Sequence, residues 1–186
     1  MLKYLMLFSI LLSTSFCTNN STKAVNNETA MKNNNPEEPK QVKIAKAEKE
    51  GIIEDENSQE LLKLVNQLRK KGCRCGRKRM KSVAPLKMNK RLNLAAQSHA
   101  QDMAAKDFFD HRGSNGSSIS DRISKTGYEW QAVGENIFWG KVGIQEVFQG
   151  WKDSPSHCKN MMGKDFREMG FAKVGDYWVQ DLGKQF

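Results

Sequence analysis

The feature that most restricts the fold of this chain is a long polar stretch, residues 18–56, which contains no aromatic side chain. Asn, Lys, Glu, Thr and Pro dominate it. Such a stretch buries too little apolar surface to offset the entropy that is lost on ordering. We therefore expect a flexible tether here, with a root-mean-square reach of roughly 35 Å. The folded part is expected within residues 57–186.

Residues 1–17 have the pattern of a secretory signal: Lys3, a short apolar run, and small polar residues before Cys17. The run is far shorter than the roughly 20 residues that span a bilayer, so a signal peptide is favoured over a permanent transmembrane helix. Cys17 resembles the processing site of bacterial lipoproteins, where the thiol is acylated. Phe16 stands where most bacteria place a small residue, a departure similar to the looser signals of spirochaete lipoproteins. Cleavage nearby and simple secretion is the alternative.

These patterns divide the chain into three parts: a signal peptide over residues 1–17 that ends at a lipidated Cys17, a tether over 18–56, and one domain over 57–186. The last part is an ordinary size for a single domain with one core. We expect an extracytoplasmic monomer held by palmitate-type acyl chains at a bacterial membrane. The outer membrane or the cell surface is the expected location.

Much of the net charge of +9 lies in one short segment of the domain. Its basic residues are Arg69, Lys70, Lys71, Arg74, Arg77, Lys78, Arg79 and Lys81. Such a cluster can bind phosphate, anionic lipid or acidic polysaccharide, and a solvated loop without a ligand is the alternative. No aromatic residue interleaves it, so bases have no platform for stacking and no specific nucleic acid partner is expected.

Three cysteines lie in the domain: Cys73 and Cys75 in the basic segment, and Cys158 far downstream. Disulfides are the default outside the cytoplasm. We therefore expect one of the two loop cysteines to pair with Cys158, which leaves the other as a free thiol. A zinc site would need a fourth ligand, and Cys-x-Cys alone is weak evidence for one.

Apolar periodicity predicts a domain of class α+β, with helices packed on a small antiparallel sheet. Helices are expected over residues 57–71, 89–107, 118–125 and 144–153. Strands are expected over residues 135–139, 169–174 and 177–182, and the last two form a hairpin. Asn57 and Glu60 resemble a capping box at the first helix.

The three histidines fall in different contexts. His99 lies on the apolar face of an Ala-rich helix, so we expect a core histidine with one hydrogen-bonded partner. His111 follows a helix exit, and His157 lies in a Ser-Pro-Ser break between elements. These two are the candidates to reach a cleft.

Seven short motifs follow one another along the domain: LVNQ at 64–67, APL at 84–86, AQSHAQDMA at 96–104, FFDH at 108–111, GENI at 134–137, GWKDSPSH at 150–157 and YWVQD at 177–181. Together they resemble the bacterial branch of the CAP superfamily, or SCP domain, which is related to cysteine-rich secretory proteins, antigen 5 and plant pathogenesis-related protein 1. The resemblance covers Asn57 to about Gly183. It implies an α-β-α sandwich.

Members of this family often carry a cleft with two His and two acidic residues, which in some of them holds a divalent metal. The resemblance places His111 and His157 at the histidine positions and Glu135 at one acidic position. Ser154 stands where eukaryotic members have the second Glu, and Glu146 lies two helical turns earlier on the same face. These groups can ligate Zn²⁺ or another divalent cation if water completes the shell. A hydrogen-bonded polar cluster without metal is the alternative.

Three functions fit these residues. The favoured one is a non-catalytic binding module for a lipid, an anionic glycan, or an envelope or host macromolecule. The second is a hydrolase in which Glu135 is the general base and His111 and His157 hold the metal. The third is a structural or adhesive surface protein that acts through the basic segment. Ser154 at an acidic position favours binding over catalysis.

Overall fold

The computed structural model describes residues 56–186, so the signal segment, Cys17 and the tether lie outside the described residues. The helices are α2 (Glu56–Lys71), α3 (Lys90–Lys106), α4 (Ile119–Lys125), α5 (Ile144–Asp153) and α6 (Pro155–Met161). The strands are β1 (Cys73–Cys75), β2 (Lys78–Met80), β3 (Lys87–Met88), β4 (Trp130–Trp139), β5 (Glu168–Val174) and β6 (Tyr177–Gln185). None of the helices in this part of the chain is both long and apolar enough to cross a membrane.

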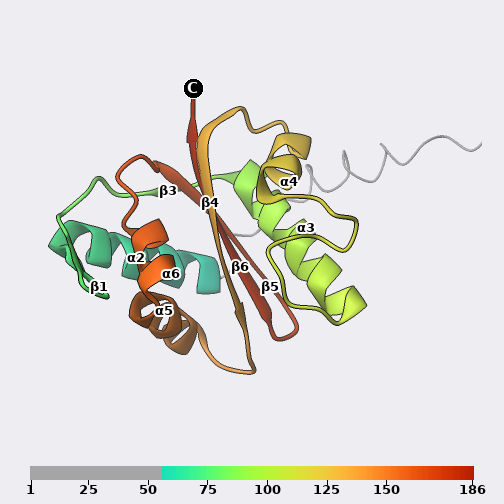
Figure 1. Ribbon diagram of the computed structural model, residues 1–186, viewed down its shortest axis with the longest axis horizontal. Helices are drawn as coiled ribbons and strands as arrows, with labels where there is room; N and C mark the ends of the chain where they lie inside the picture. The colour runs from blue at the N-terminus through green and yellow to red at the C-terminus, as the bar shows by residue number, and fades with distance from the viewer. Residues whose placement is uncertain (1–55) are drawn as a thin grey trace, which may run out of the picture. The chain divides into compact units, whose positions relative to one another are not determined.

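A four-stranded sheet with the order β3-β5-β6-β4 forms the centre of the domain. Strands β5, β6 and β4 are antiparallel neighbours, whereas the short edge strand β3 runs parallel to β5. Helix α3 covers one face of the sheet, and α2, α5 and α6 cover the other (Figure 1). The predicted α-β-α sandwich is therefore confirmed.

Alternation along the strands explains the two cores. Phe171 and Trp178 point to the side of α2, α5 and α6, where they pack with Trp151. Their neighbours Ala172 and Val179 point to the opposite side and pack against α3. Successive side chains of a strand face opposite ways, so one sheet supports both helical layers.

Helix α3 approaches the sheet very closely at Gly170. A Cβ atom at this position would overlap the carbonyl carbon of Leu92 in α3. The small residues Ala96 and Ala100 continue the same tight contact along the helix. This contact fixes the height of α3, and of His99 on it, above the sheet.

The predicted helices are confirmed to within one or two residues at each end. Strand β4 begins at Trp130, five residues earlier than expected, because the segment 130–134 continues to pair with the end of β6. The sequence did not predict α6, β3 or the β1–β2 hairpin. The sheet was expected to be antiparallel throughout, but β3 makes its edge parallel.

Candidate functional site

Glu135 on β4 is the centre of a buried polar cluster at the α3 face of the sheet. Its carboxylate is only 2% exposed, and both oxygens are engaged. His111 Nδ1 lies 2.7 Å from Oε1, and Arg122 Nη2 donates to Oε2 at 2.6 Å. Both contacts are charge-assisted, so they outweigh the cost of burying the carboxylate and hold the pKa of Glu135 below its ordinary value.

Helix α4 supplies the arginine. A capping box between Ser118 and Asp121 fixes the start of this helix. One turn later, Arg122 donates to the carbonyl oxygens of Ser117 and His111 at 3.1 Å and 3.0 Å, as well as to Glu135. The guanidinium therefore fastens α4 and the loop that carries His111 to the sheet.

His99 completes the cluster from α3. The side chain is fully buried, and its Nε2 donates to the carbonyl oxygen of Asp110 at 2.9 Å. The same nitrogen lies 3.8 Å from Oε1 of Glu135. Burial lowers the pKa of His99 and outweighs the opposing effect of Glu135, so the ring is neutral. The prediction of a core histidine with one hydrogen-bonded partner is confirmed.

Asp181 on β6 lies opposite Glu135 in the strand register. It is completely buried. Its carboxyl oxygens make no hydrogen bond of good geometry within residues 56–186, and the polar group that they face is the side chain of Glu135. Burial raises the pKa of Asp181 well above its ordinary value, and the neighbouring Glu135 carboxylate raises it further. The two pKa values are therefore shifted in opposite directions, which favours an ionised Glu135 beside a protonated Asp181.

His157 lies in α6, and its backbone is tied to β4. Asn136 Nδ2 donates to the carbonyl oxygen of His157 at 3.3 Å and to Oε1 of Gln180 at 2.9 Å. Asn160 in the same helix donates to the carbonyl oxygen of Glu135 and to Oδ1 of Asn136. Burial, with a smaller effect of His111, lowers the pKa of the His157 ring.

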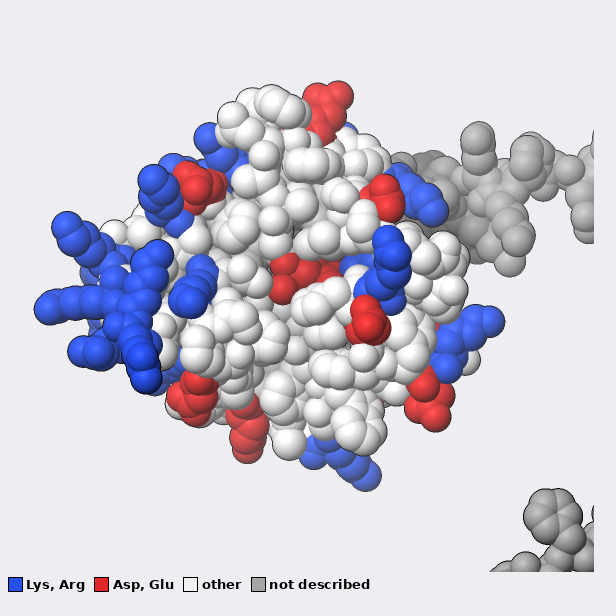
Figure 2. Space-filling model, viewed as in Figure 1, with Lys and Arg blue, Asp and Glu red and all other residues white. Residues whose placement is uncertain are grey.

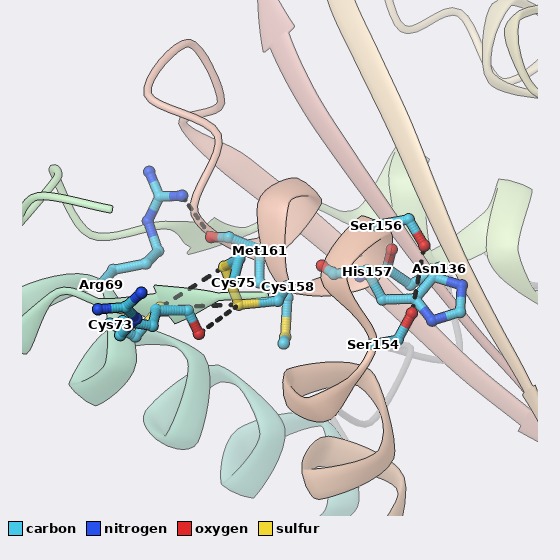
Figure 3. The surroundings of a disulfide bond; sticks show 10 residues. Arg69, Cys73, Cys75, Asn136, Ser154, Ser156, His157, Cys158 and Met161 are labelled. Carbon is cyan, nitrogen blue, oxygen red and sulfur yellow. Dashed lines mark hydrogen bonds between the residues drawn. A yellow bond between two sulfur atoms is a disulfide. The ribbon is translucent and has the colours of Figure 1, made fainter. Parts of the chain in front are cut away.

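The two remaining cleft positions do not join the cluster. Ser154 ends α5, and its hydroxyl lies 3.2 Å from that of Ser156 (Figure 3). Glu146 is exposed in the first turn of α5, where its carboxylate folds back toward Gly143. The structure therefore brings together Glu135 and His111, with His157 as a neighbour, but not Glu146.

The donor set does not fit a divalent cation. One oxygen of Glu135 is held by the guanidinium of Arg122, whose positive charge repels a metal at the same place. In the described part of the chain, the ligand atoms of His111, Glu135 and His157 do not all lie within 4.8 Å of one another, and the only group that meets this distance is Cys73, Cys75 and Cys158. The geometry thus corresponds to the polar cluster that was the alternative to a metal site.

Sequence reasoning did not include Arg122 and Asp181 in the cluster. A signal for each exists in the apolar pattern. Arg122 precedes Ile123 on the inner side of a short helix, and Asp181 lies two residues after Val179 on the strand face that α3 covers. A charged residue at a position where the periodicity requires an apolar one indicates a buried partner.

The basic segment forms the second candidate site. Seven of its cations are exposed on the end of α2 and on the β1–β2 hairpin, and they gather at one edge of the molecule (Figure 2). We call this set the basic hairpin surface: Lys70, Lys71, Arg74, Arg77, Lys78, Arg79 and Lys81.

Arg69 is a correction to the predicted basic segment. Its side chain is fully buried, and its guanidinium donates to the carbonyl oxygens of Ala84, Met161, Gly163 and Phe166. The reason is its position on α2, one residue after Leu68, on the helix face that packs into the core. Arg69 therefore contributes to packing and not to the surface charge.

A disulfide fixes the basic hairpin surface to the domain. Cys75 on β1 pairs with Cys158 on α6, and Cys73 is left as a free thiol (Figure 3). Gly76 adopts a positive φ of 60° in the turn that follows β1, a backbone conformation that favours glycine. The disulfide thus holds strand β1 to α6, and Gly76 permits the tight turn that follows.

A scan against protein families matches residues 62–182 to the CAP, cysteine-rich secretory protein family. The uncharacterized protein YkwD of Bacillus subtilis is 31% identical over 105 residues, which are 55% of this chain and 41% of that protein. An outer surface protein of Borrelia burgdorferi superposes with a TM-score of 0.63 at 21% identity, over 73% of this chain and 97% of that one. An extracellular protein of Bacillus anthracis that contains an SCP domain superposes with a TM-score of 0.62 at 22% identity, over 69% of this chain and 40% of that one. The chain thus spans about two fifths of the length of the Bacillus proteins.

Proposed function

Because this chain belongs to the CAP, cysteine-rich secretory protein family, we propose that it is a non-catalytic binding protein whose basic hairpin surface binds an acidic polysaccharide. The observation that carries the proposal is the density of unpaired positive charge. Within residues 56–186, none of the seven cations of this surface forms an ion pair. Their charge is therefore available to an external polyanion.

The chemistry of the surface favours a polymer of acidic groups. Three of its cations are arginines, Arg74, Arg77 and Arg79, whose planar guanidinium can bind a carboxylate or sulfate through two parallel hydrogen bonds. The disulfide and the hairpin hold these side chains on a fixed backbone, so little ordering entropy is lost when the polymer binds.

An anionic lipid surface is the less favoured ligand. Proteins that lie on a bilayer insert apolar side chains beside their cations. The exposed large apolar residues of the described chain are Phe109, Trp139, Val142 and Phe186, and all of them lie outside the basic hairpin surface. The basic hairpin surface therefore carries charge but no large exposed apolar side chain that could insert into a bilayer.

The polar cluster supports binding over catalysis. Glu135 has both oxygens engaged and a lowered pKa, so its carboxylate is a poor proton acceptor at neutral pH. If the Glu135 carboxylate took up a proton, the buried guanidinium of Arg122 would be left without a counter-ion. We therefore assign this cluster to the stability of the cleft.

We place the protein outside the cytoplasm, anchored at a bacterial membrane by acyl chains on Cys17. Support comes from the signal pattern of residues 1–17 and from the Cys75–Cys158 disulfide, which suits an oxidising compartment. The extracellular and outer surface relatives agree with this location. The polar stretch 18–56 would hold the basic hairpin surface away from the bilayer.

Binding of the purified protein to polygalacturonate, with neutral dextran as a reference, tests the proposal. We expect saturable binding to the acidic polymer that weakens as salt rises, because the contacts are exposed charges. Replacing Arg74, Arg77 and Arg79 by Gln should weaken it at least about tenfold, which corresponds to about 1.4 kcal/mol.

A second variant with the same change in net charge separates a local surface from a general charge effect. It replaces Lys106, Lys125 and Lys164, which are exposed elsewhere on the domain, by Gln. We expect its affinity to stay near that of the wild type. Equal losses in the two variants, or binding that salt does not weaken, would contradict the proposal.

A further inference from the structure

Three sulfur atoms meet where the basic hairpin contacts α6. The Sγ atom of Cys73 lies 3.7 Å from that of Cys75 and 3.7 Å from that of Cys158 (Figure 3). Cys75 and Cys158 form the disulfide and are 1% and 0% exposed, whereas the free Cys73 is partly exposed. A free thiol in contact with a buried disulfide is the arrangement that thiol–disulfide exchange requires.

We propose that these three cysteines form a thiol–disulfide exchange site, in which Cys73 is the entry sulfur and the external substrate is a small anionic thiol. The site is separate from the Glu135 cluster. It borders the basic hairpin surface, but the exchange reaction does not depend on the binding of a polysaccharide. It gives the basic hairpin a chemical role in addition to its charge.

The first step is internal. The thiolate of Cys73 attacks Sγ of Cys158, a Cys73–Cys158 disulfide forms, and the Cys75–Cys158 bond breaks. Cys75 leaves as a thiolate and takes up the proton that Cys73 gave to solvent. Because Cys73 lies equally far from both sulfurs, it first rotates about its Cα–Cβ bond to approach in line with the disulfide, a rapid motion for a partly exposed side chain.

The strand geometry explains why Cys158 is the sulfur attacked. Cys73 and Cys75 are two residues apart on β1, so both side chains point to the same face, toward α6. Either one can therefore reach Cys158 from the same strand. A Cys73–Cys75 bond would instead join two positions of one extended strand, near the upper limit of Cα separation for a disulfide.

The second step uses the external thiol. Its thiolate attacks Sγ of Cys73 in the new disulfide, a mixed disulfide forms on Cys73, and Cys158 leaves as a thiolate. At this point two thiols, the external one and that of Cys73, have been consumed to form the mixed disulfide. Two thiols, those of Cys75 and Cys158, have been released, so protons and electrons balance. A second external thiol releases Cys73 and leaves as a small disulfide.

The surroundings of Cys73 select the substrate class. Cys73 lines an open pocket of about 740 Å³ together with four cations of the basic hairpin surface: Lys71, Arg74, Arg79 and Lys81. These charges attract an anionic thiol and repel a cationic one. Lys152 also acts on Cys73 and favours its thiolate, although burial is the larger effect and raises the pKa of Cys73. The internal step should therefore be fastest at mildly alkaline pH.

The first experiment maps the disulfides of the full-length chain without reductant. The protein is held at about pH 8, its free thiols are blocked with N-ethylmaleimide, and it is cut with trypsin. Trypsin cleaves after Arg74 and separates Cys73 on residues 72–74 from Cys75 on 75–77, while Cys17 falls on another fragment. We expect label on both Cys73 and Cys75 in the folded protein. A urea-unfolded sample is the control and should carry label on both cysteines. If that control holds and the folded protein carries label on Cys73 alone, the proposal is overturned.

The second experiment measures how fast the disulfide of Cys158 is reduced. The probes are mercaptoethanesulfonate, 2-mercaptoethanol and cysteamine, which are anionic, neutral and cationic thiols of similar size. Each rate is divided by the rate of the same thiol on a model disulfide. We expect the corrected rate to be highest for the anionic thiol and to fall at least about tenfold in Cys73→Ser.

Ser82→Ala is the matched control, because Ser82 lines the same pocket and carries no sulfur. It should keep the wild-type rate. Cys73→Ala is measured beside Cys73→Ser, and an unchanged unfolding midpoint excludes loss of folding as the cause. Reduction of both Cys73 variants at the wild-type rate would overturn the entry role of Cys73. Equal corrected rates for the three thiols would overturn the substrate class.

Discussion

Asp181 and Glu135 are cross-strand neighbours on the same buried face of the sheet, and their pKa values are shifted in opposite directions. Arg122 and His111 hold Glu135 in its ionised form. Asp181 has no such hydrogen bond in the described chain. Burial raises its pKa well above the ordinary value, and the negative charge of Glu135 raises it further, so its protonated form is favoured. The arrangement makes the stability of the domain depend on pH in a defined direction.

We expect Asp181→Asn to stabilise the protein at neutral pH by about 1–3 kcal/mol, because Asn carries no proton to lose. The folded pKa of Asp181 is raised, so its favourable contribution is complete below the unfolded pKa of 3.8. As pH rises from there toward the folded pKa, the unfolded state releases its proton first, and stability falls by about 1.4 kcal/mol per pH unit. Urea unfolding as a function of pH should show this slope in the wild type and a smaller one in the variant.

Asp176→Asn is the control for that comparison, since Asp176 is exposed in the turn between β5 and β6. Its effect on the free energy of unfolding should stay within about 0.5 kcal/mol. A wild type and an Asp181→Asn variant with the same pH dependence would show that Asp181 is not held protonated.

A second prediction concerns the ion pair of Glu135 and Arg122, whose side chains are 2% and 6% exposed. Glu135→Gln should destabilise the protein by about 3–5 kcal/mol because it leaves a buried guanidinium without a counter-ion. The double variant with Arg122→Met should be less destabilised than the sum of the two single variants. Additive losses in such a double-mutant cycle would mean that the two groups are not coupled. Glu129→Gln, at an exposed position, is the control for the loss of one carboxylate.

A third prediction concerns the charge of His111. Its hydrogen bond to Glu135 raises the pKa of His111 above 6.5, although burial opposes the effect. The favourable contribution of this pair is complete below pH 6.5 and is lost as pH rises through the raised pKa. NMR titration of the three histidines should give His111 the highest pKa and should show it falling in Glu135→Gln. His99 and His157 should titrate below 6.5.

The parts of the fold that the sequence predicted are those with regular apolar spacing. Helix α5 follows its pattern from Ile144 to Trp151 and was predicted with the correct bounds. Helix α6 was missed because Ser-Pro-Ser was interpreted as a break, whereas Pro155 occupies the first turn of a helix, where its missing N–H has no cost. The hairpin strands β1 and β2 are short and charged, and so carry no alternation.

The candidate site was predictable only in part. His111, Glu135 and His157 were identified by resemblance to a family, and His99 by its place on an apolar helix face. Arg122 and Asp181 were not, because the spacing of residues within one element does not reveal which charged groups from separate elements meet in the core. Only the packing of α3 and α4 on β4 and β6 brings them together.

Arg69 allows the sharpest separation of a packing role from a surface role, since it lies beside exposed Lys70 in the same basic run. Burial lowers the pKa of Arg69 to about 10, and Arg167 adds repulsion, yet the group remains charged at neutral pH. Arg69→Lys should cost about 2–4 kcal/mol, because one ammonium group cannot reach the four carbonyl oxygens that the guanidinium spans. Lys70→Met should change the free energy of urea unfolding by less than about 0.5 kcal/mol but should weaken binding to polygalacturonate. An Arg69→Lys protein as stable as the wild type would show that the guanidinium does not tie α2 to the loops that follow Lys81 and α6.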